Sequence, residues 1–225
     1  MLNKQKGNMY GFVTHTWNPI KGKCPHNCSY CYMKELVKSE LHLDEKDLTK
    51  THLGSNNYIF IGSSTDMFAN EVPKEWIFRV LGMCRLNEND NTFLFQTKNP
   101  MRFLEFEGFY PKHTVLCITI ETNRDIEGIN CPQPANRALI FSDKHFDKYT
   151  KMITIEPILD FDVPALIDLI QQVHPKYVNI GADSKKHNLK EPSIFKIENL
   201  ITGINKMTNI TLKENLHRLG EVKNG

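Results

Sequence analysis

The sequence predicts an α/β fold in which six strands alternate with helices along a chain of 225 residues. Three observations predict it. Short apolar runs bounded by turn residues recur along the chain, stretches with helical apolar spacing separate them, and no internal repeat or linker interrupts the series. Strands that alternate with helices form a parallel sheet with right-handed crossovers. Because a complete eight-fold barrel typically needs about 250 residues, six strand–helix units predict a partial (β/α)6-type open TIM barrel.

The strands are predicted from short runs rich in β-branched and aromatic residues. The first, 12–17, alternates apolar and polar residues and ends at Asn18-Pro19. The run at 58–62 is apolar almost throughout, which is typical of a strand buried on both faces. The other strands are predicted at 92–96, 114–120, 152–157 and 177–181, with one further short strand at 210–212.

The helices are predicted from apolar residues at helical spacing and from prolines near the starts. Segment 135–146 fits a helix or a strand by its pattern, and a helix is favoured. Segment 39–57 is polar and charged, and we expect a helix extension followed by a surface loop. The other helices are predicted at 33–37, 73–84, 100–106, 163–173 and 192–201.

Length and composition predict a single domain that folds without help from a metal. A chain of this length buries about 70–75% of the surface that its unfolded form would expose. We expect one domain over 1–225, with a core of about 10–185 and a helix and strand extension at 186–225. Lysine plus arginine (28) nearly balances aspartate plus glutamate (26), so any basic site must be local. The chain has no apolar run long enough to span a membrane and no signal-peptide core, which predicts a cytoplasmic protein.

Three cysteines follow the first predicted strand with the spacing C-x3-C-x2-C: Cys24, Cys28 and Cys31. Six cysteines, half of them in one loop, favour a reduced compartment and a metal site over a disulfide framework. An all-cysteine [4Fe–4S] cluster needs four thiolates, and no fourth cysteine comes before Cys84. One iron would therefore keep an open position for a small molecule, much as a catalytic zinc does.

His26 in the same loop leaves a second metal site open, a closed zinc site with Cys3His ligands. Such a site would make the chain a non-catalytic metal-binding protein on the same scaffold, and this is the alternative function. Four ligands so close in sequence would be cramped around a tetrahedral ion, which favours the cluster. A bare electron-transfer cluster would need a fourth cysteine, and the sequence nominates none among Cys84, Cys117 and Cys131.

Polar residues stand at the carboxyl ends of the predicted strands, where the loops of a parallel β/α fold converge on one mouth. A single polar residue at such a place is weak evidence, because every strand end leaves the core. The whole set is more informative. It consists of Ser63, Ser64 and Asp66 after the second strand, Lys98 after the third, Glu121 and Asn123 after the fourth, Glu156 after the fifth and Asp183 after the sixth.

The cysteine spacing, with Tyr30 just before the third cysteine, resembles the signature of the radical S-adenosylmethionine superfamily. The chain is also similar to a phage-associated branch of that superfamily, which is distantly similar to spore photoproduct lyase. The superfamily often has a Gly-Gly-Glu-like element after its second strand, where this chain has Ser63-Ser64-Thr65-Asp66 and so keeps a carboxylate. The stretches that carry the branch resemblance are 16–20, 63–68, 96–100, 155–157 and 179–182.

The resemblance implies a mechanism. Three cysteines bind a [4Fe–4S] cluster, and the amino and carboxylate groups of S-adenosylmethionine bind its fourth iron. An external flavodoxin- or ferredoxin-like reductant supplies one electron, which cleaves S-adenosylmethionine to methionine and a 5′-deoxyadenosyl radical. That radical takes a hydrogen atom from a substrate, for which the branch suggests a nucleotide or nucleic acid.

By position, the resemblance also implies contacts to S-adenosylmethionine. Ser63, Ser64 and Asp66 would receive the amino group, and Lys98 the carboxylate. Glu121 would bind the ribose hydroxyls, and Tyr30 would lie near the adenine. Asn123 and Glu156 belong to the same expected mouth.

Two further features follow the fourth and sixth strands. Cys131 lies in a proline-rich loop, and we predict that its thiol returns a hydrogen atom to a product radical, as one does in some relatives. Cys84 and Cys117 are predicted to be packing residues. The basic cluster Lys185-Lys186-His187 with Lys190 is either a solvated loop or a contact to substrate phosphate, and the second reading predicts salt-sensitive binding.

Overall fold

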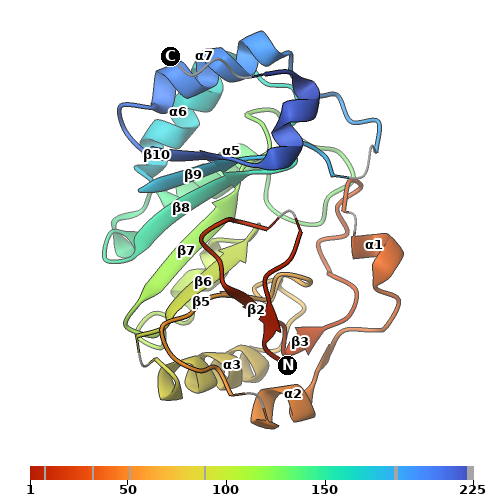
Figure 1. The fold of residues 1–225 in the computed structure, drawn as a ribbon, viewed down its shortest axis with the longest axis vertical. Helices are drawn as coiled ribbons and strands as arrows, with labels where there is room; N and C mark the ends of the chain where they lie inside the picture. Colours follow the sequence, from red (N-terminus) through yellow and green to blue (C-terminus); the bar gives the residue numbers. More distant parts are fainter. Residues whose placement is uncertain (8, 32, 51, 89, 185–186, 222–225) are drawn as a thin grey trace. The chain divides into compact units, whose positions relative to one another are not determined.

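The computed structural model describes residues 1–221 apart from 8, 32, 51, 89, 185 and 186. The chain forms two compact units (Figure 1): unit 1 holds 1–116 and 128–131, and unit 2 holds 117–127 and 132–225. Strand β7 (Thr114–Thr119) is divided between them. Among the described residues the strand order is β1 (Asn3–Lys4), β2 (His15–Trp17), β5 (Tyr58–Ile61), β6 (Thr92–Thr97), β7, β8 (Thr150–Ile155), β9 (Tyr177–Ile180) and β10 (Asn209–Leu212), with β1 and β10 at its two ends. The predicted open, mostly parallel α/β sheet is confirmed.

Unit 1 is built on β2 (His15–Trp17), β5 (Tyr58–Ile61) and β6 (Thr92–Thr97), which run parallel. The short β1 (Asn3–Lys4) adds an antiparallel edge on β2. Trp17, Ile61 and Phe95 are aligned across the three parallel strands, and each is fully buried. In this register β2 and β5 end level, and β6 continues from Phe95 to Thr97, so the loops that follow the three strands start at one edge.

Helices and aromatic rings close the core of unit 1. Helix α3 (Lys74–Leu86) buries its apolar face, including Cys84, which confirms the predicted packing role. Phe68 lies edge-on to Phe95 and Phe103, and the second of these belongs to α4 (Met101–Leu104). The segment that follows β5 is therefore anchored in the core only a few residues beyond the strand end.

A small antiparallel ladder joins the two ends of the segment that contains the three cysteines. Strand β3 (Ile20–Lys21) pairs with β4 (His42–Leu43), and α1 (Met33–Leu36) lies in the segment between them. The expected helix extension over 39–57 is wrong in part, because the chain forms β4 and then α2 (Glu45–Lys50). Strands of two residues are too short to show the alternation of apolar and polar residues from which a strand is predicted.

Unit 2 continues the parallel arrangement with β8 (Thr150–Ile155), β9 (Tyr177–Ile180) and β10 (Asn209–Leu212). The short final strand predicted at 210–212 is thus confirmed, and the fully buried Cys117 confirms its predicted packing role. The helix favoured at 135–146 is confirmed as α5 (Pro134–Phe141) followed by the 3-10 turn Lys144–Phe146. The remaining elements are α6 (Val163–Val173), α7 (Ile194–Ile204) and the 3-10 segment Glu214–Leu219.

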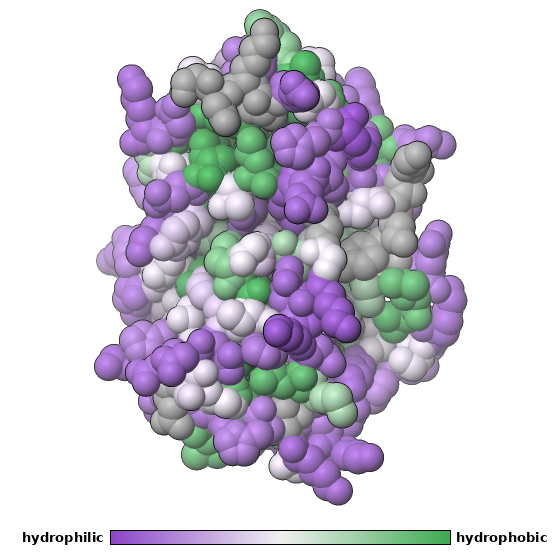
Figure 2. Space-filling model, viewed as in Figure 1, coloured by the Kyte–Doolittle hydropathy of each residue, from purple (hydrophilic) through white to green (hydrophobic). Residues whose placement is uncertain are grey.

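The surface is mixed in character. On the face drawn in Figure 2, hydrophobic residues form small separate groups among hydrophilic ones. None of the helices in the described ranges is both long enough and apolar enough to cross a membrane.

Candidate metal and cofactor site

The cysteine loop is a series of tight turns. The amide of Asn27 donates to the carbonyl of Cys24 at 3.2 Å, and the amide of Cys31 donates to the carbonyl of Cys28 at 3.1 Å. Asn27 has φ 47°, a left-handed value that asparagine tolerates better than most residues. A third turn, from the amide of Lys34 to the carbonyl of Cys31 at 3.1 Å, starts α1. Successive turns of this kind carry three thiols on eight residues.

His26, between the first two cysteines, is 2% exposed and is fixed by both ring nitrogens. Its Nε2 lies 2.9 Å from Oδ2 of Asp66, and its Nδ1 lies 3.3 Å from the carbonyl oxygen of Asn130. Both partner atoms are acceptor oxygens. Burial lowers the pKa of His26, but the Asp66 carboxylate outweighs it and the pKa is raised. Both ring nitrogens are engaged in contacts with protein oxygens in this structure.

Asp66 receives four hydrogen bonds. Its Oδ2 accepts from His26, from Oγ1 of Thr97 at 2.9 Å and from the amide of Lys98 at 2.8 Å. Its Oδ1 accepts from the amide of Phe68 at 3.0 Å. Burial raises the pKa of this carboxyl, yet His26 and the amide donors outweigh it and the pKa is lowered. One carboxylate therefore joins the cysteine loop to the carboxyl ends of β5 and β6.

The serines after β5 are placed by a turn and by Asn18. Gly62 has φ 76°, and a side chain there would be strained. Oδ1 of Asn18 accepts from Oγ of Ser63 and from the amide of Ser64, each at 3.2 Å. Both serines are half-buried. Asn18, part of the Asn-Pro break after β2, thus orients the loop in which two cofactor contacts were predicted.

Lys98 and Tyr30 lie together. The Nζ of Lys98 is 5.5 Å from the centroid of the Tyr30 ring, which is 5% exposed. At this distance a cation and an aromatic face attract each other. The residue before the third cysteine is therefore in contact with the residue after β6, and the structure brings these two predicted site residues together.

The segment 128–131 belongs to unit 1 and pairs with the cysteine loop. The amide of Asn130 donates to the carbonyl of His26 at 2.8 Å, and its Nδ2 lies 3.4 Å from the carbonyl of Pro25. Cys131 follows directly and is half-buried. The structure thus places the loop that carries Cys131 against the loop that carries the three other cysteines.

The donor set fits an iron–sulfur cluster in its chemistry. None of the six cysteines forms a disulfide, and three of them lie in one short loop. Burial raises the pKa of the Cys24 thiol to about 12, with the Asp66 charge adding to the shift, so metal binding must release its proton. No three His, Cys, Asp or Glu side chains are grouped to hold a metal ion in the ranges that the structure describes.

Glu121, after β7 in unit 2, is fully buried in an ion pair. Its Oε2 accepts from Nη1 of Arg137 at 2.7 Å, and both side chains are 0% exposed. Arg137 also donates to the carbonyl oxygens of Thr119 at 2.9 Å and Pro132 at 2.6 Å. The predicted ribose contact of Glu121 stays a prediction, and the carboxylate has an internal partner here.

Glu156, after β8, is paired with Lys213, which follows β10. The Nζ of Lys213 donates to Oε2 of Glu156 at 2.8 Å, and the two side chains are 7% and 19% exposed. A Cβ on Gly181 would lie 3.0 Å from the Glu156 carboxylate and 3.1 Å from the Lys213 stem. Gly181 therefore allows this ion pair to lie close against the end of β9.

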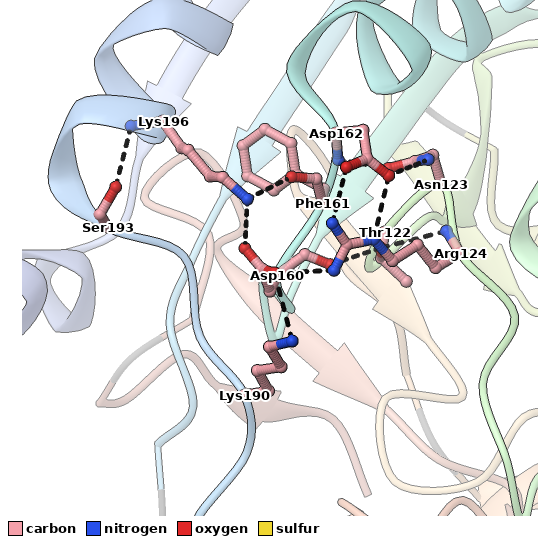
Figure 3. Close-up of polar contacts among 9 residues, drawn as sticks. All are labelled: Thr122, Asn123, Arg124, Asp160, Phe161, Asp162, Lys190, Ser193 and Lys196. Atoms are coloured by element: carbon pink, nitrogen blue, oxygen red, sulfur yellow. Dashed lines mark hydrogen bonds and ion pairs between the residues drawn. The ribbon is translucent and has the colours of Figure 1, made fainter.

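Asn123 belongs to a charged network in unit 2 (Figure 3). Its Nδ2 donates to Oδ2 of Asp162 at 3.2 Å, and Arg124 grips the same carboxylate with two nitrogens at 3.0 and 2.6 Å. Arg124 also reaches Asp160 at 2.7 Å, and Lys196 donates to Asp160 at 2.6 Å. This network ties the loop after β7 to the loop after β8 and to the first turn of α7.

Asp183, after β9, is 5% exposed and accepts from Nδ1 of His187 at 2.7 Å. Of the predicted basic cluster, Lys185 and Lys186 lie outside the described residues. Lys190 is 82% exposed and lies 3.8 Å from Asp160.

The sequence did not reveal several partners at these strand ends. Asn18 stands next to a proline, a pattern that predicts the end of a strand and not a contact to Ser63 and Ser64. The place of His26 between cysteines suggests a zinc ligand and does not predict its contact with Asp66. Arg137 and Lys213 are far in sequence from the carboxylates that they contact, and no local pattern marks them.

Comparison with known proteins gives a family and a fold. The family described as "Protein of unknown function (DUF5131)" matches residues 9–160. No curated protein matches the chain. A structure of spore photoproduct lyase complexed with dinucleoside spore photoproduct has a TM-score of 0.67 at 8% identity, over 92% of this chain and 79% of that one.

Two solved structures with the cofactor bound are also similar. Spore photoproduct lyase with bound AdoMet and dinucleoside spore photoproduct has a TM-score of 0.61 at 11% identity, over 90% of this chain. SuiB from Streptococcus suis, bound to S-adenosylmethionine, has a TM-score of 0.60 at 11% identity, over 91% of this chain. This chain spans 64% and 51% of those two chains. The predicted resemblance to the radical S-adenosylmethionine superfamily is confirmed at the level of the fold, and the phage association stays a prediction.

Proposed function

This chain belongs to the DUF5131 family, and we propose that it is a radical S-adenosylmethionine enzyme. One observation carries the proposal: three cysteines that form no disulfide, on one loop after β2, lie in the same unit as the polar ends of β5 and β6. The fold is that of solved structures with bound S-adenosylmethionine. In parallel β/α folds, chemistry is carried by loops at this edge of the sheet.

Cys24, Cys28 and Cys31 would hold a [4Fe–4S] cluster. When bound, the cluster supplies one electron, received from a flavodoxin- or ferredoxin-like reductant, for the reductive cleavage of S-adenosylmethionine. The protein binds, orients and shields the reacting groups. The half-buried hydroxyls of Ser63 and Ser64 suit the amino group of S-adenosylmethionine, and the ammonium of Lys98 suits its carboxylate.

The ammonium of Lys98 lies over the Tyr30 ring. In this proposal S-adenosylmethionine either displaces the lysine from the ring or contacts both side chains. Glu121, Asn123 and Glu156 stay predicted contacts. Because each already has a partner in unit 2, we assign the principal S-adenosylmethionine contacts to unit 1.

Cys131 is the proposed hydrogen-atom donor. Its loop is hydrogen-bonded to the cysteine loop through Asn130, which supports a place close to the reacting groups. A Cys131→Ala variant should keep S-adenosylmethionine cleavage and lose or divert product formation. Unchanged turnover of substrate to product by that variant would remove this assignment.

The function is tested by reconstituting the protein with iron and sulfide without oxygen, adding S-adenosylmethionine and dithionite, and measuring 5′-deoxyadenosine. We expect 5′-deoxyadenosine from the natural chain and none from a Cys31→Ser variant. An intact cluster that yields none would contradict the proposal. Stoichiometric zinc without iron or sulfide in anaerobically purified protein would favour the non-catalytic alternative.

The proposed substrate class is a nucleotide or nucleic acid. The support is the dinucleoside ligand of the similar spore photoproduct lyase structures and the exposed ammonium of Lys190 in unit 2. Binding of a short labelled DNA strand should weaken as salt rises. Lys190→Ala should reduce the slope of that salt dependence by about 1, whereas Lys46→Ala, an exposed lysine of α2, should leave it unchanged. An unaltered slope in Lys190→Ala would contradict the phosphate contact.

A further inference from the structure

We infer that His26 and Asp66 are positioning residues that lock the cysteine loop onto the ends of β5 and β6, and that Asp66 does not bind S-adenosylmethionine. This role rests on the proposed function, since it concerns how the cluster loop is held. It also changes the role of Asp66 from a cofactor contact to a support for the metal ligands.

The first reason is that the Asp66 carboxylate is saturated. A carboxylate offers about four lone-pair directions. Asp66 already accepts four hydrogen bonds, three on Oδ2 and one on Oδ1. Its side chain is 11% exposed. An incoming ammonium group would have to displace a backbone amide or the buried ring of His26, and the half-buried hydroxyls of Ser63 and Ser64 are easier to reach.

The second reason is the position of His26. It stands within the C-x3-C interval, two residues from Cys24 and two from Cys28. Its ring contacts the Asp66 carboxylate at 2.9 Å, and the His26 side chain is 3% exposed, so this contact links the middle of the loop to the residue that follows β5 by five positions. Asp66 follows β5 and also accepts from Thr97 and from the amide of Lys98 at the end of β6. The contact with His26 therefore fixes the cysteine loop to the ends of both strands.

The third reason is that His26 also holds the segment 128–131. Its carbonyl accepts from the Asn130 amide, and its Nδ1 reaches the Asn130 carbonyl. A single side chain and its own backbone therefore join the cysteine loop, the strand ends and the loop that carries Cys131. Groups that orient metal ligands in this way typically change metal affinity by about 10–100-fold when they are removed.

The experiment separates positioning from cofactor binding by two readouts on anaerobically reconstituted protein. Retention of iron is measured during titration with a chelator, and the dissociation constant of S-adenosylmethionine is measured from the change that it causes in the electron paramagnetic resonance signal of the reduced cluster. His26→Phe and Asp66→Asn should weaken iron retention about tenfold or more. His26→Gln keeps one donor toward Asp66 and should fall between His26→Phe and the natural chain.

The affinity for S-adenosylmethionine discriminates the two roles of Asp66. In the fraction of Asp66→Asn that keeps its cluster, we expect an S-adenosylmethionine dissociation constant within about threefold of the natural chain. Ser64→Ala should instead raise that constant and keep its iron. A tenfold rise in Asp66→Asn with unchanged iron retention would overturn the inference, and so would a His26→Phe variant that holds iron as the natural chain does.

A matched control is His145→Phe, because His145 and Asp143 form a similar pair at 2.6 Å in unit 2, where both side chains are half exposed. Thermal unfolding of the metal-free variants reports on the fold. If His26→Phe does not fold, Thr97→Val decides: it removes one donor to Asp66, and iron retention equal to the natural chain would overturn the inference. A natural chain that takes up no iron and sulfide contradicts the proposed function itself, whatever the variants do.

Discussion

In unit 2 the carboxylates after β7 and β8 each contact a cation of the same unit, and the carboxylate after β9 contacts a histidine, whereas in unit 1 the Ser63 hydroxyl after β5 donates to an asparagine. Glu121 meets Arg137 where neither is exposed, and Glu156 meets Lys213. The thiols of the cysteine loop, in contrast, form no disulfide. The strand ends of unit 2 thus use their charges to hold the fold, and those of unit 1 present the thiols and hydroxyls to which we propose that the cofactors bind.

Asp66 is the instructive exception in unit 1. It resembles the carboxylates of unit 2, because it is largely buried and contacts a basic side chain from a distant part of the chain. Its partner, His26, lies between two predicted metal ligands. The role of a carboxylate at a strand end therefore depends on the residue that it contacts. The residue type alone does not distinguish a structural role from ligand binding.

The largest expected effect is in unit 2. Arg137→Met should lower the free energy of unfolding by about 3–5 kcal/mol, because it leaves the Glu121 carboxylate buried without its cation. Urea unfolding of the metal-free protein measures the loss. Arg124→Met, which removes a partly exposed arginine from the same unit, is the matched control and should cost less. A loss below about 1 kcal/mol in Arg137→Met would contradict the structural role of this pair.

A smaller effect is expected at Gly181. Gly181→Ala should destabilise unit 2 by about 1–3 kcal/mol, because its Cβ would lie 3.0 Å from Glu156 and the ion pair with Lys213 would have to shift. Gly82→Ala in α3 meets nothing within 4 Å and should stabilise by about 0.5–1 kcal/mol. Thermal unfolding of both variants gives the sign of each change in stability. A change of the same sign in both variants would contradict the close packing at Gly181.

The sequence predicted the sheet well because its strands are apolar and separated by helices with clear periodicity. All six main strands, the short final strand and the favoured helix at α5 are confirmed. The ladder of β3 and β4 was not predicted, since two residues carry no periodicity.

The candidate site was predicted in its residues more than in its contacts. Cys24, Cys28 and Cys31 share one loop, so spacing alone places them within eight residues of one another. Pairs such as Glu121 with Arg137 depend on tertiary packing of residues that are 16 apart, and neither propensity nor spacing contains that information. The saturation of Asp66 is of the same kind, because its donors come from three separate segments.

A substitution in the cysteine loop should affect metal binding much more than stability, which is the opposite of what we expect for the ion pairs of unit 2. Cys31→Ser replaces a half-buried thiol, so the free energy of unfolding of the metal-free protein should change by less than about 1 kcal/mol. Iron and sulfide content after reconstitution should fall to the level of a protein without the cluster. Chemical analysis of iron and sulfide, with Cys84→Ser as the control cysteine, measures this. Full iron content in Cys31→Ser would show that the loop does not use this thiol.

The smallest effect is expected at the Arg124–Asp162 pair, whose side chains are 38% and 55% exposed. Hydrogen bonds from Arg124 and Asn123 hold the pKa of the Asp162 carboxyl well below its usual range. A carboxyl with a lowered pKa contributes stability that is fully present above its unfolded pKa of about 3.9 and is lost as pH falls toward the folded value. Asp162→Asn should therefore unfold at a slightly lower temperature than the natural chain at pH 5–8, and the two curves should converge below about pH 4. Melting curves across pH 3–8 test this, and a difference that grows toward acid pH would mean that the pair opposes folding.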